Sequence, residues 1–324
     1  MVASFDGSSV LVTGGTGSFG KKMISTLLSQ SKARRIIVYS RDELKQFQMQ
    51  QDYQGESRLR FFIGNVRDRD RLMRALTDVN YVIHAAAMKQ IPAAEYNPFE
   101  AVKTNIMGAQ NIIDAAIDCG VEKVVALSTD KASSPVNLYG ATKLVSDKLF
   151  VHGNAYAGDH NTRFSVVRYG NVVGSRGSVI PFFRQLAESG STVMPVTDER
   201  MTRFWITLEQ AVDLVITAFR EMTGGEIFVP KIPSMKVTDL ALAINPGCEI
   251  NVIGIRPGEK LHEEMISETD ARRTVDMGQH YVIQPEFEWF DSSHGTALPD
   301  GFSYSSEIND DWLDVPRLQA MLDD

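Results

Sequence analysis

The hydrophobic positions of the chain fall into short runs rich in β-branched residues, each bounded by turn residues. Segments of helical composition fill most of the gaps between these runs. This alternation is typical of a parallel sheet that is covered by helices on both faces. The pattern predicts strands at Ser9–Thr13, Arg35–Tyr39, Leu59–Ile63, Tyr81–Ala85, Lys123–Leu127 and Phe164–Arg168.

The rhythm loosens after Tyr169, where glycine and proline become frequent. An amphipathic stretch at Leu208–Arg220 follows, among mixed short elements. We therefore predict an α/β fold built on a doubly wound parallel sheet, with a smaller C-terminal region. Residues 1–170 form the sheet domain in this prediction. Residues 171–324 form a mainly substrate-binding region, interleaved with the first in one structural unit.

Composition and charge narrow the class of protein. The 324 residues are 43% hydrophobic and 23% charged, as in ordinary globular proteins. The net charge is −8, but residues 285–324 hold ten acidic residues against one arginine, so this tail contributes −9 and the remainder about +1. A nucleic-acid binder is expected to show a basic face, so we predict no nucleic-acid partner.

Cysteine content and the N-terminus bear on the compartment. Cys119 and Cys248 are too few and too isolated for a disulfide framework or a metal knuckle. The histidines have no metal-ligand partner at a useful spacing, so we predict no metal. The chain starts without a signal peptide, and no apolar run approaches the ~20 residues that span a bilayer. We expect a cytoplasmic protein with no membrane partner.

A glycine-rich loop follows the first predicted strand. Gly14, Gly17 and Gly20 are spaced as GxxGxxG, just before a helical segment that starts near Lys21. Gly14 permits a tight turn, Gly17 lets backbone N–H groups approach a pyrophosphate, and Gly20 lets helix and strand pack closely. This strand–turn–helix context predicts a Rossmann-type dinucleotide site. The other residues of the loop expected to contact the cofactor are Thr16, Ser18 and Phe19.

The end of the second strand indicates which dinucleotide binds. Ser40 and Arg41 stand where the 2′-phosphate of NADP would lie, and Lys45 can add a second positive charge from the next helix. This favours NADP and makes residues 1–170 an NADP-binding domain. The alternative is that Asp42 binds the ribose and Arg41 only pairs with Asp42. After the third and fourth strands come the expected contacts to adenine and to the rest of the cofactor, Asn65, Val66, Ala85 and Ala86.

Hydroxyl-bearing and charged residues that can transfer protons follow the fifth strand. Ser128-Thr-Asp-Lys131 ends this strand, and Tyr139 and Lys143 come after a short loop. Tyr139 and Lys143 are four residues apart, so they share one face of a helix. The Lys143 ammonium can bind the nicotinamide ribose and lower the pKa of the Tyr139 phenol, which would make Tyr139 a base near neutral pH.

These motifs together resemble the extended short-chain dehydrogenase/reductases. Within them the chain is similar, essentially end to end, to the UDP-N-acetylglucosamine 4,6-dehydratases that invert C5 and open the pseudaminic acid pathway. The segments that carry the resemblance are Thr13–Gly20, His84–Lys89, Ser128–Lys131, Asn137–Lys143, Arg168–Asn171, Arg256–His262 and Ser305–Trp312. One departure is Asn65, where many members carry Asp, although an Asn carbonyl can still accept from adenine.

The resemblance implies a reaction with no net oxidation. Thr129 holds the C4 hydroxyl and Tyr139 takes the O4 proton while hydride passes from C4 to NADP. Lys131 then removes the C5 proton and Asp130 protonates the departing O6, after which the hydride returns to C6. The alternative for Asp130 and Lys131 is a solvated ion pair in a loop.

The resemblance also implies where the UDP-sugar lies. Met88 and Lys89 would lie beside the sugar and Asn171 would bind the diphosphate. Arg256 and Glu259 would hold phosphate and uridine ribose, and the alternative for these two is a pair of surface charges on a turn. Arg203 is a further candidate. Relatives form multimers, so we expect a homo-oligomer.

Two other functions compete with the dehydratase. One is a UDP-N-acetylhexosamine 4-epimerase, which would return the hydride to C4; Asp130 and Lys131 argue against it. The other is a non-catalytic NADP-sensing regulatory protein, against which Thr129, Tyr139 and Lys143 argue. Tyr139 also predicts inversion at C5, because membrane-anchored relatives that retain C5 often carry Met at this place.

Overall fold

The computed structural model describes residues 5–174, 179–290 and 294–323. The strands of the nucleotide-binding half are β1 (Ser9–Thr13), β2 (Arg35–Ser40), β3 (Leu59–Ile63), β4 (Tyr81–His84), β5 (Lys123–Leu127) and β6 (Arg163–Val167). The later strands are β7 (Asn171–Val172), β8 (Val193–Val196), β9 (Thr202–Ile206), β10 (Ile227–Pro230), β11 (Ser234–Lys236), β12 (Glu249–Val252), β13 (Glu264–Ile266), β14 (Thr274–Asp276), β15 (His280–Ile283), β16 (Thr296–Ala297) and β17 (Tyr304–Ser305).

Helices connect most of these strands. Those before β7 are α1 (Ser18–Gln30), α2 (Glu43–Asp52), α3 (Arg69–Ala75), α4 (Ile91–Tyr96), α5 (Pro98–Ala101), α6 (Gly108–Asp118) and α7 (Leu138–Tyr156). The later ones are α8 (Val179–Glu188), α9 (Leu208–Glu221), α10 (Val237–Ile244), α11 (Glu268–Ala271) and α12 (Val315–Asp323). A π-helical turn at Val102–Met107 joins α5 to α6, and a 3₁₀ turn at Asp130–Ala132 follows β5.

The central sheet has ten strands among the described residues, in the order β16-β14-β15-β10-β6-β5-β4-β1-β2-β3. The seven strands from β10 to β3 are parallel, and β15, β14 and β16 continue the sheet antiparallel. The chain leaves β1 toward β2 and β3 and later returns to β4, β5 and β6 on the other side. The switch point between β1 and β4 is where ligands bind in doubly wound sheets.

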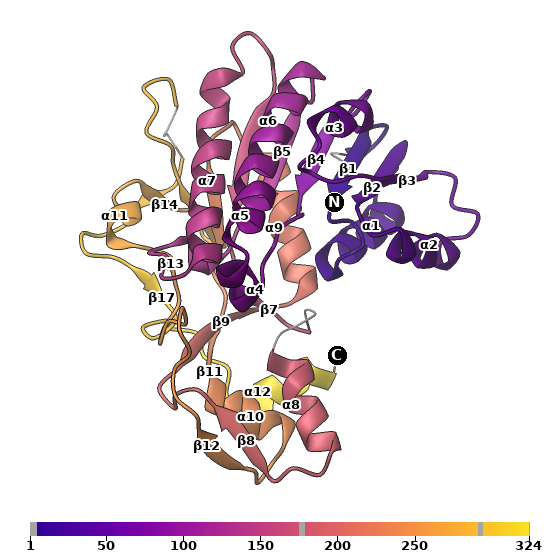
Figure 1. Cartoon of the computed structure of the whole chain (residues 1–324). Helices are drawn as coiled ribbons and strands as arrows, with labels where there is room; N and C mark the ends of the chain where they lie inside the picture. The colour runs from indigo at the N-terminus through magenta and orange to yellow at the C-terminus, as the bar shows by residue number, and fades with distance from the viewer. Residues whose placement is uncertain (1–4, 175–178, 291–293, 324) are drawn as a thin grey trace.

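Helices cover both faces of this sheet (Figure 1). α3, α6 and α7 pack beside one another on one face, and α1 packs against α9 on the other. The inner strands of the sheet are largely apolar; Val10, Leu11 and Val12 of β1 have no exposed surface. The predicted Rossmann-type sheet is therefore confirmed. The pattern was readable in the sequence because strands that are buried on both faces appear as continuous β-branched runs.

A smaller lobe lies below the sheet in Figure 1 and has its own hydrophobic core. α8, α10, α12 and the two-stranded sheet β8–β12 surround this core. Its largest fully buried side chains are Trp205 and Phe183. The second half of the chain also returns to the main sheet through β10, β14, β15 and β16. This interleaving fits the proposed division at residue 170, which stays a prediction.

Most predicted elements lie within a residue or two of their observed bounds. The amphipathic stretch at Leu208–Arg220 is α9, which Thr207 and Gln210 cap reciprocally. α1 begins at Ser18, three residues earlier than expected, because the helix starts directly after Gly17. Across the described ranges, no helix is long and apolar enough to cross a membrane.

Candidate active site

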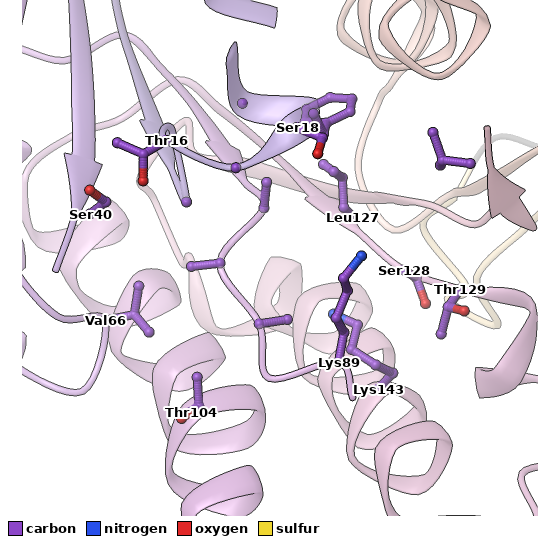
Figure 2. A pocket seen from close by; sticks show the side chains of 18 of the residues that line it. Thr16, Ser18, Ser40, Val66, Lys89, Thr104, Leu127, Ser128, Thr129 and Lys143 are labelled. Carbon is purple, nitrogen blue, oxygen red and sulfur yellow. The ribbon is translucent and has the colours of Figure 1, made fainter. Parts of the chain in front are cut away.

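A cavity of about 560 Å³ lies at the carboxyl ends of the parallel strands. The loops after β1, β2, β3, β4 and β5 line it, together with α7. Figure 2 shows Thr16, Ser40 and Val66 toward one side of this cavity and Ser128, Thr129 and Lys143 toward the other. The expected cofactor residues that line it are Gly14, Thr16, Gly17, Ser18, Phe19, Gly20, Ser40, Arg41, Lys45, Asn65, Val66, Ala85, Ala86, Tyr139 and Lys143.

The glycine loop has the shape that a dinucleotide requires. Gly14 has φ +66°, a conformation that other residues rarely adopt. A Cβ on Gly20 would lie 2.6 Å from the Gly14 carbonyl oxygen, so α1 packs on this loop only with glycine there. No side chain caps Gly17 at the start of α1, and the first turn holds no acidic residue. The helix N-terminus therefore offers backbone N–H groups to an anion, and these residues fit a dinucleotide pyrophosphate.

The loop after β2 bears on the choice of dinucleotide. The Asp42 carboxylate accepts a hydrogen bond from the Lys45 backbone N–H at 3.0 Å and pairs with Lys45 Nζ at 2.6 Å. Asp42 thus caps α2, and its ion pair is with Lys45, whereas the alternative had Arg41 as its partner. Arg41 is exposed at the cavity wall. Gln46 donates to the Ser40 hydroxyl at 3.0 Å, which orients Ser40 in the same wall.

Asn65 and Val66 line the cavity beside Tyr39, a residue that the sequence did not single out. Tyr39 donates to the Asn65 backbone carbonyl at 3.0 Å, and the Asn65 side-chain oxygen accepts from the Arg67 backbone N–H at 3.1 Å. Gly64 allows this packing, since a Cβ there would lie 2.4 Å from the Tyr39 ring. The strand β2 therefore sets the position of the loop after β3.

A buried neutral histidine joins the loops after β1 and β4. The Thr13 hydroxyl is 2.9 Å from His84 Nδ1 and accepts the backbone N–H groups of Ala85 and Ala86, each at 3.1 Å. Burial, with the Lys143 charge adding to it, lowers the pKa of His84 to about 3. His84 is thus neutral near pH 7, and its role is to fix the backbone at Ala85 and Ala86.

Thr129 caps the 3₁₀ turn after β5, Asp130 and Lys131 belong to that turn, and all three residues line the same cavity. Thr129 donates to Asp130 Oδ1 at 2.9 Å. Lys131 Nζ lies 3.0 Å from Asp130 Oδ1 and 3.0 Å from Glu263 Oε1. The Asp130 side chain is 1% exposed and that of Lys131 18%, so the solvated-pair alternative is wrong.

Two carboxylates hold Lys131 as an ammonium. Burial alone would lower the pKa of Lys131, but the charges of Asp130 and then Glu263 outweigh it and raise the pKa above its usual range. Lys131 can therefore act as a base only after its proton has moved to a neighbour. Either of these two carboxylates, each 3.0 Å from Lys131 Nζ, is close enough to accept that proton.

Tyr139 and Lys143 share the inner face of α7, as expected, and both line the cavity. The expectation that Lys143 lowers the pKa of Tyr139 is not met in this structure. Burial raises the pKa of Tyr139 to about 12; the Lys131 charge and a hydrogen bond with Thr129 oppose this rise. Lys143 is itself buried, which lowers its own pKa, and Asp147 one turn further along α7 opposes that shift.

A second cavity of about 460 Å³ adjoins the first. Ile91, Lys131 and Asn171 line both, so the two cavities meet at Lys131. Asn171 Oδ1 is buried and has no hydrogen-bond partner among the described residues. The expected substrate residues in the second cavity are Asn171, Arg203, Arg256 and Glu259.

Arg203 and Met88 differ from the other expected substrate residues. The Arg203 guanidinium donates to backbone carbonyls, at 3.1 Å to Lys260 and 3.1 Å to Leu261, so its donors hold the loop that carries Arg256 and Glu259.

Met88 lines neither cavity. Asn105, in the π-helical turn, grips both backbone groups of Met88 at 2.8 and 2.9 Å. Lys89, the next residue, lines the first cavity, and burial lowers its pKa.

Close backbone approach fixes the distance between Lys131 and α7. Asn137 caps α7 through the Gly140 N–H at 2.8 Å, and a Cβ on Gly140 would lie 2.1 Å from the Lys131 carbonyl oxygen. Replacement of Gly140 by alanine should therefore lower the free energy of unfolding by roughly 1–3 kcal/mol, as overpacking does. Chemical denaturation measures the change.

The matched control for this prediction is Gly153→Ala, which lies on the same helix. The nearest contact of a Cβ there is a flexible Ile113 methyl at 3.2 Å, so the loss should be smaller. Equal stability of Gly140→Ala and the wild type would show that α7 does not approach Lys131 this closely.

Comparison with known proteins agrees with this geometry. The family described as polysaccharide biosynthesis protein matches residues 10–285. A Campylobacter jejuni protein described as UDP-N-acetylglucosamine 4,6-dehydratase (inverting) is 56% identical, over 97% of this chain and 97% of its own. A Rickettsia akari protein described as UDP-glucose 4-epimerase is 40% identical, over 86% and 83%.

Solved structures share the fold. The X-ray structure of Pen from Bacillus thuringiensis has a TM-score of 0.90, 37% identity and coverage of 98% of both chains. DesIV, a dTDP-glucose 4,6-dehydratase from Streptomyces venezuelae solved with NAD and TYD bound, has a TM-score of 0.69 and 24% identity, over 78% of this chain and 86% of that one. The chain belongs to the polysaccharide biosynthesis protein family, within the extended short-chain dehydrogenase/reductases.

Proposed function

We propose that this chain is a UDP-N-acetylglucosamine 4,6-dehydratase that inverts C5. Its product would be UDP-2-acetamido-2,6-dideoxy-β-L-arabino-hex-4-ulose, an intermediate suited to pseudaminic acid biosynthesis. The observation that carries the proposal is the buried Asp130–Lys131 pair, 3.0 Å apart, at the junction of two cavities. The 56% identity to the Campylobacter jejuni dehydratase supports the substrate and the reaction.

The first cavity would hold the dinucleotide. When bound, an oxidised nicotinamide accepts hydride from C4, later returns it to C6, and adds a positive charge to the cavity. NADP is the proposed form, because Arg41 is exposed at the wall and Ser40 lies beside it. Asp42, the residue that would favour NAD, already caps α2 and pairs with Lys45.

Tyr139 and Thr129 act on the C4 hydroxyl in this proposal. Thr129 orients the hydroxyl, and Tyr139 takes its proton while C4 is oxidised. The Tyr139 phenol needs help to do so, because burial raises its pKa to about 12. The positive charge of Lys131, which lines the same cavity, favours the phenolate.

Asp130 and Lys131 then eliminate water. The ketone at C4 acidifies the C5 proton, which passes to Lys131 once the Lys131 proton has moved to Asp130. Asp130 returns that proton to O6 as water leaves. Finally, when the hydride returns to C6, Tyr139 gives C5 the proton that it took from O4. If Lys131 and Tyr139 approach C5 from opposite faces, as inversion requires, the configuration changes and every proton is accounted for.

The second cavity would hold the UDP group. Asn171 Oδ1 has no hydrogen-bond partner among the described residues, and Arg256 offers its planar guanidinium to phosphate. Glu259 lies on the same turn, which Asn137 ties to α7 by donating to Gly258 at 2.7 Å. Lys89 would reach the sugar from the first cavity. A homo-oligomer remains part of this proposal.

A 4-epimerase is the second candidate, since the Rickettsia akari protein described as a UDP-glucose 4-epimerase is 40% identical. Incubation with UDP-N-acetylglucosamine separates the two. A product lighter by one water supports the dehydratase, and an isomer of unchanged mass would establish the epimerase. NMR couplings at the earliest times should give the L-arabino configuration; only the D-xylo isomer would overturn inversion, and no product at all would favour an NADP-sensing protein.

Arg41→Ala should weaken binding of NADP by roughly 1–3 kcal/mol, the range of a charge-assisted contact with the 2′-phosphate. Affinity for NAD should change little, because NAD lacks that phosphate. Titration calorimetry with both dinucleotides measures the difference. Glu43→Gln, an exposed change two residues away in the first turn of α2, is the control. An equal loss for NAD and NADP would mean that Arg41 does not bind the 2′-phosphate.

Tyr139→Phe and Lys131→Ala should block different steps. Tyr139→Phe should lower turnover by about 10²–10⁴-fold, the usual contribution of a positioned base, with dinucleotide affinity largely intact. Lys131→Ala should slow hydride transfer, because the Tyr139 phenolate loses a nearby positive charge, but reduced-nicotinamide absorbance should still appear transiently. This variant should release little water. Normal dehydration by Lys131→Ala would assign the C5 base to another residue.

A further inference from the structure

A buried cluster of charges lies where the two halves of the chain meet. Glu263, just before β13, is 2% exposed, and its Oε1 is 3.0 Å from Lys131 Nζ and 3.8 Å from Arg203 Nε. Asp130 Oδ1 also lies 3.0 Å from Lys131 Nζ. In these ion pairs two carboxylates face two cations, Lys131 and Arg203. Glu263 is the member that neither the motifs nor the reaction above uses.

The backbone of Glu263 is clamped at both of its polar groups. Its N–H donates to the Ser306 hydroxyl at 2.9 Å, and its carbonyl accepts from the Ser306 N–H at 2.8 Å. β13 pairs with β17 immediately beyond this point. Glu263 is thus fixed by the fold of the C-terminal half, while Lys131 belongs to the turn after β5.

One oxygen of the Glu263 carboxylate makes no hydrogen bond with the described residues. Its Oε2 and Asp130 Oδ2 are both buried and have no hydrogen-bond partner among the described residues. Asp130 lines the first cavity, Glu263 the second, and Lys131 both. Leaving buried carboxylate oxygens unpaired is costly, so this arrangement would not be expected from packing alone.

We propose that Glu263 is a positioning residue for the elimination step, which holds the Lys131 side chain against Asp130 so that the pair passes one proton from C5 to O6. The inference rests on the proposed function and adds a residue to it. Glu263 neither gains nor loses a proton. It acts through Lys131, whose ammonium it holds by the 3.0 Å ion pair.

The protons and electrons of this step balance within the pair. The Lys131 proton moves to Asp130 Oδ1 across 3.0 Å, leaving an amine beside a carboxylic acid. The amine takes the C5 proton of the 4-keto sugar, the C5–H electron pair becomes the C5–C6 double bond, and the C6–O6 pair stays on oxygen. Asp130 protonates O6, water leaves, and the pair is again carboxylate and ammonium.

At high pH the proton that Asp130 and Lys131 share is lost to solvent. Elimination then fails, because no acidic group remains to protonate O6. The groups that face Lys131 decide where this happens: Asp130 and Glu263 favour its ammonium, whereas burial and Arg203 oppose it. Lys260 and Tyr139 also belong to this charge environment. Since Glu263 raises the pKa of Lys131, its removal should lower that pKa and move the alkaline limb of activity to lower pH.

Glu263→Gln tests the proposal, and Glu226→Gln is the control. Glu226 is also a buried carboxylate, but it lines neither cavity. In Glu263→Gln, the rate of water loss at neutral pH should fall about 10–100-fold, as expected when a catalytic group is misplaced by roughly 1 Å. The transient reduced-nicotinamide absorbance should persist, and the alkaline limb should move to lower pH. Glu263→Asp, which keeps the charge, should restore the limb and part of the rate. Glu226→Gln should leave the limb in place, even if it melts earlier.

Acetylation of Lys131 by acetic anhydride, followed by peptide mass spectrometry across the alkaline range, tests the contact without any substrate. Lys131 should acetylate at lower pH in Glu263→Gln than in the wild type or Glu226→Gln. An unchanged acetylation profile overturns the proposal. So does a shifted profile with wild-type rates of water loss. If the wild type releases no water, the proposed function fails, and the acetylation profile still decides whether Glu263 controls Lys131.

Discussion

The ammonium of Lys131, buried between two carboxylates, is the interaction on which the rest of the site depends. Charges are rarely buried without partners, because desolvation costs several kcal/mol per ion. Asp130 supplies one partner from the same turn and Glu263 supplies the other from the distant C-terminal half. The two halves must therefore dock correctly before Lys131 is held.

Several backbone features serve this docking. The parallel strands bring their carboxyl ends to one edge of the sheet, which places the glycine loop, Ser40, Ala85 and Thr129 around a single cavity. Gly140 lets α7 approach the Lys131 carbonyl closely enough for Tyr139 to share that cavity. Within the C-terminal half, Arg203 donates to the backbone carbonyls of Lys260 and Leu261, the segment just before Glu263.

The sequence predicted what depends on local pattern. Strands buried on both faces read as apolar runs, and the glycine spacing between a strand and a helix indicates a dinucleotide loop. The spacing of Tyr139 and Lys143 predicts that they share one face of α7, and their place after the fifth strand and the glycine loop distinguishes them from a chance pair. Their catalytic and binding roles stay predictions, as does the role of Asp130 and Lys131 in proton transfer.

Features that depend on distant contacts were not visible. Glu263 looks like one acid among Glu259, Glu263 and Glu264, and only the pairing of β13 with β17 brings it to Lys131. Asn105 gave no signal beyond a polar residue in a helical segment. The pKa of Tyr139 was expected to fall, but burial raises it, because desolvation depends on everything packed around the phenol.

Reaction of UDP-N-acetylglucosamine deuterated at C5 tests the central claim most directly. If Asp130 and Lys131 eliminate water, the product must be lighter by one water, the C5 deuterium must be replaced by a proton from solvent or enzyme, and water loss must be slowed by the label while C4 oxidation is not. A product that retains the O6 hydroxyl and the C5 deuterium, with no loss of mass, would contradict the account.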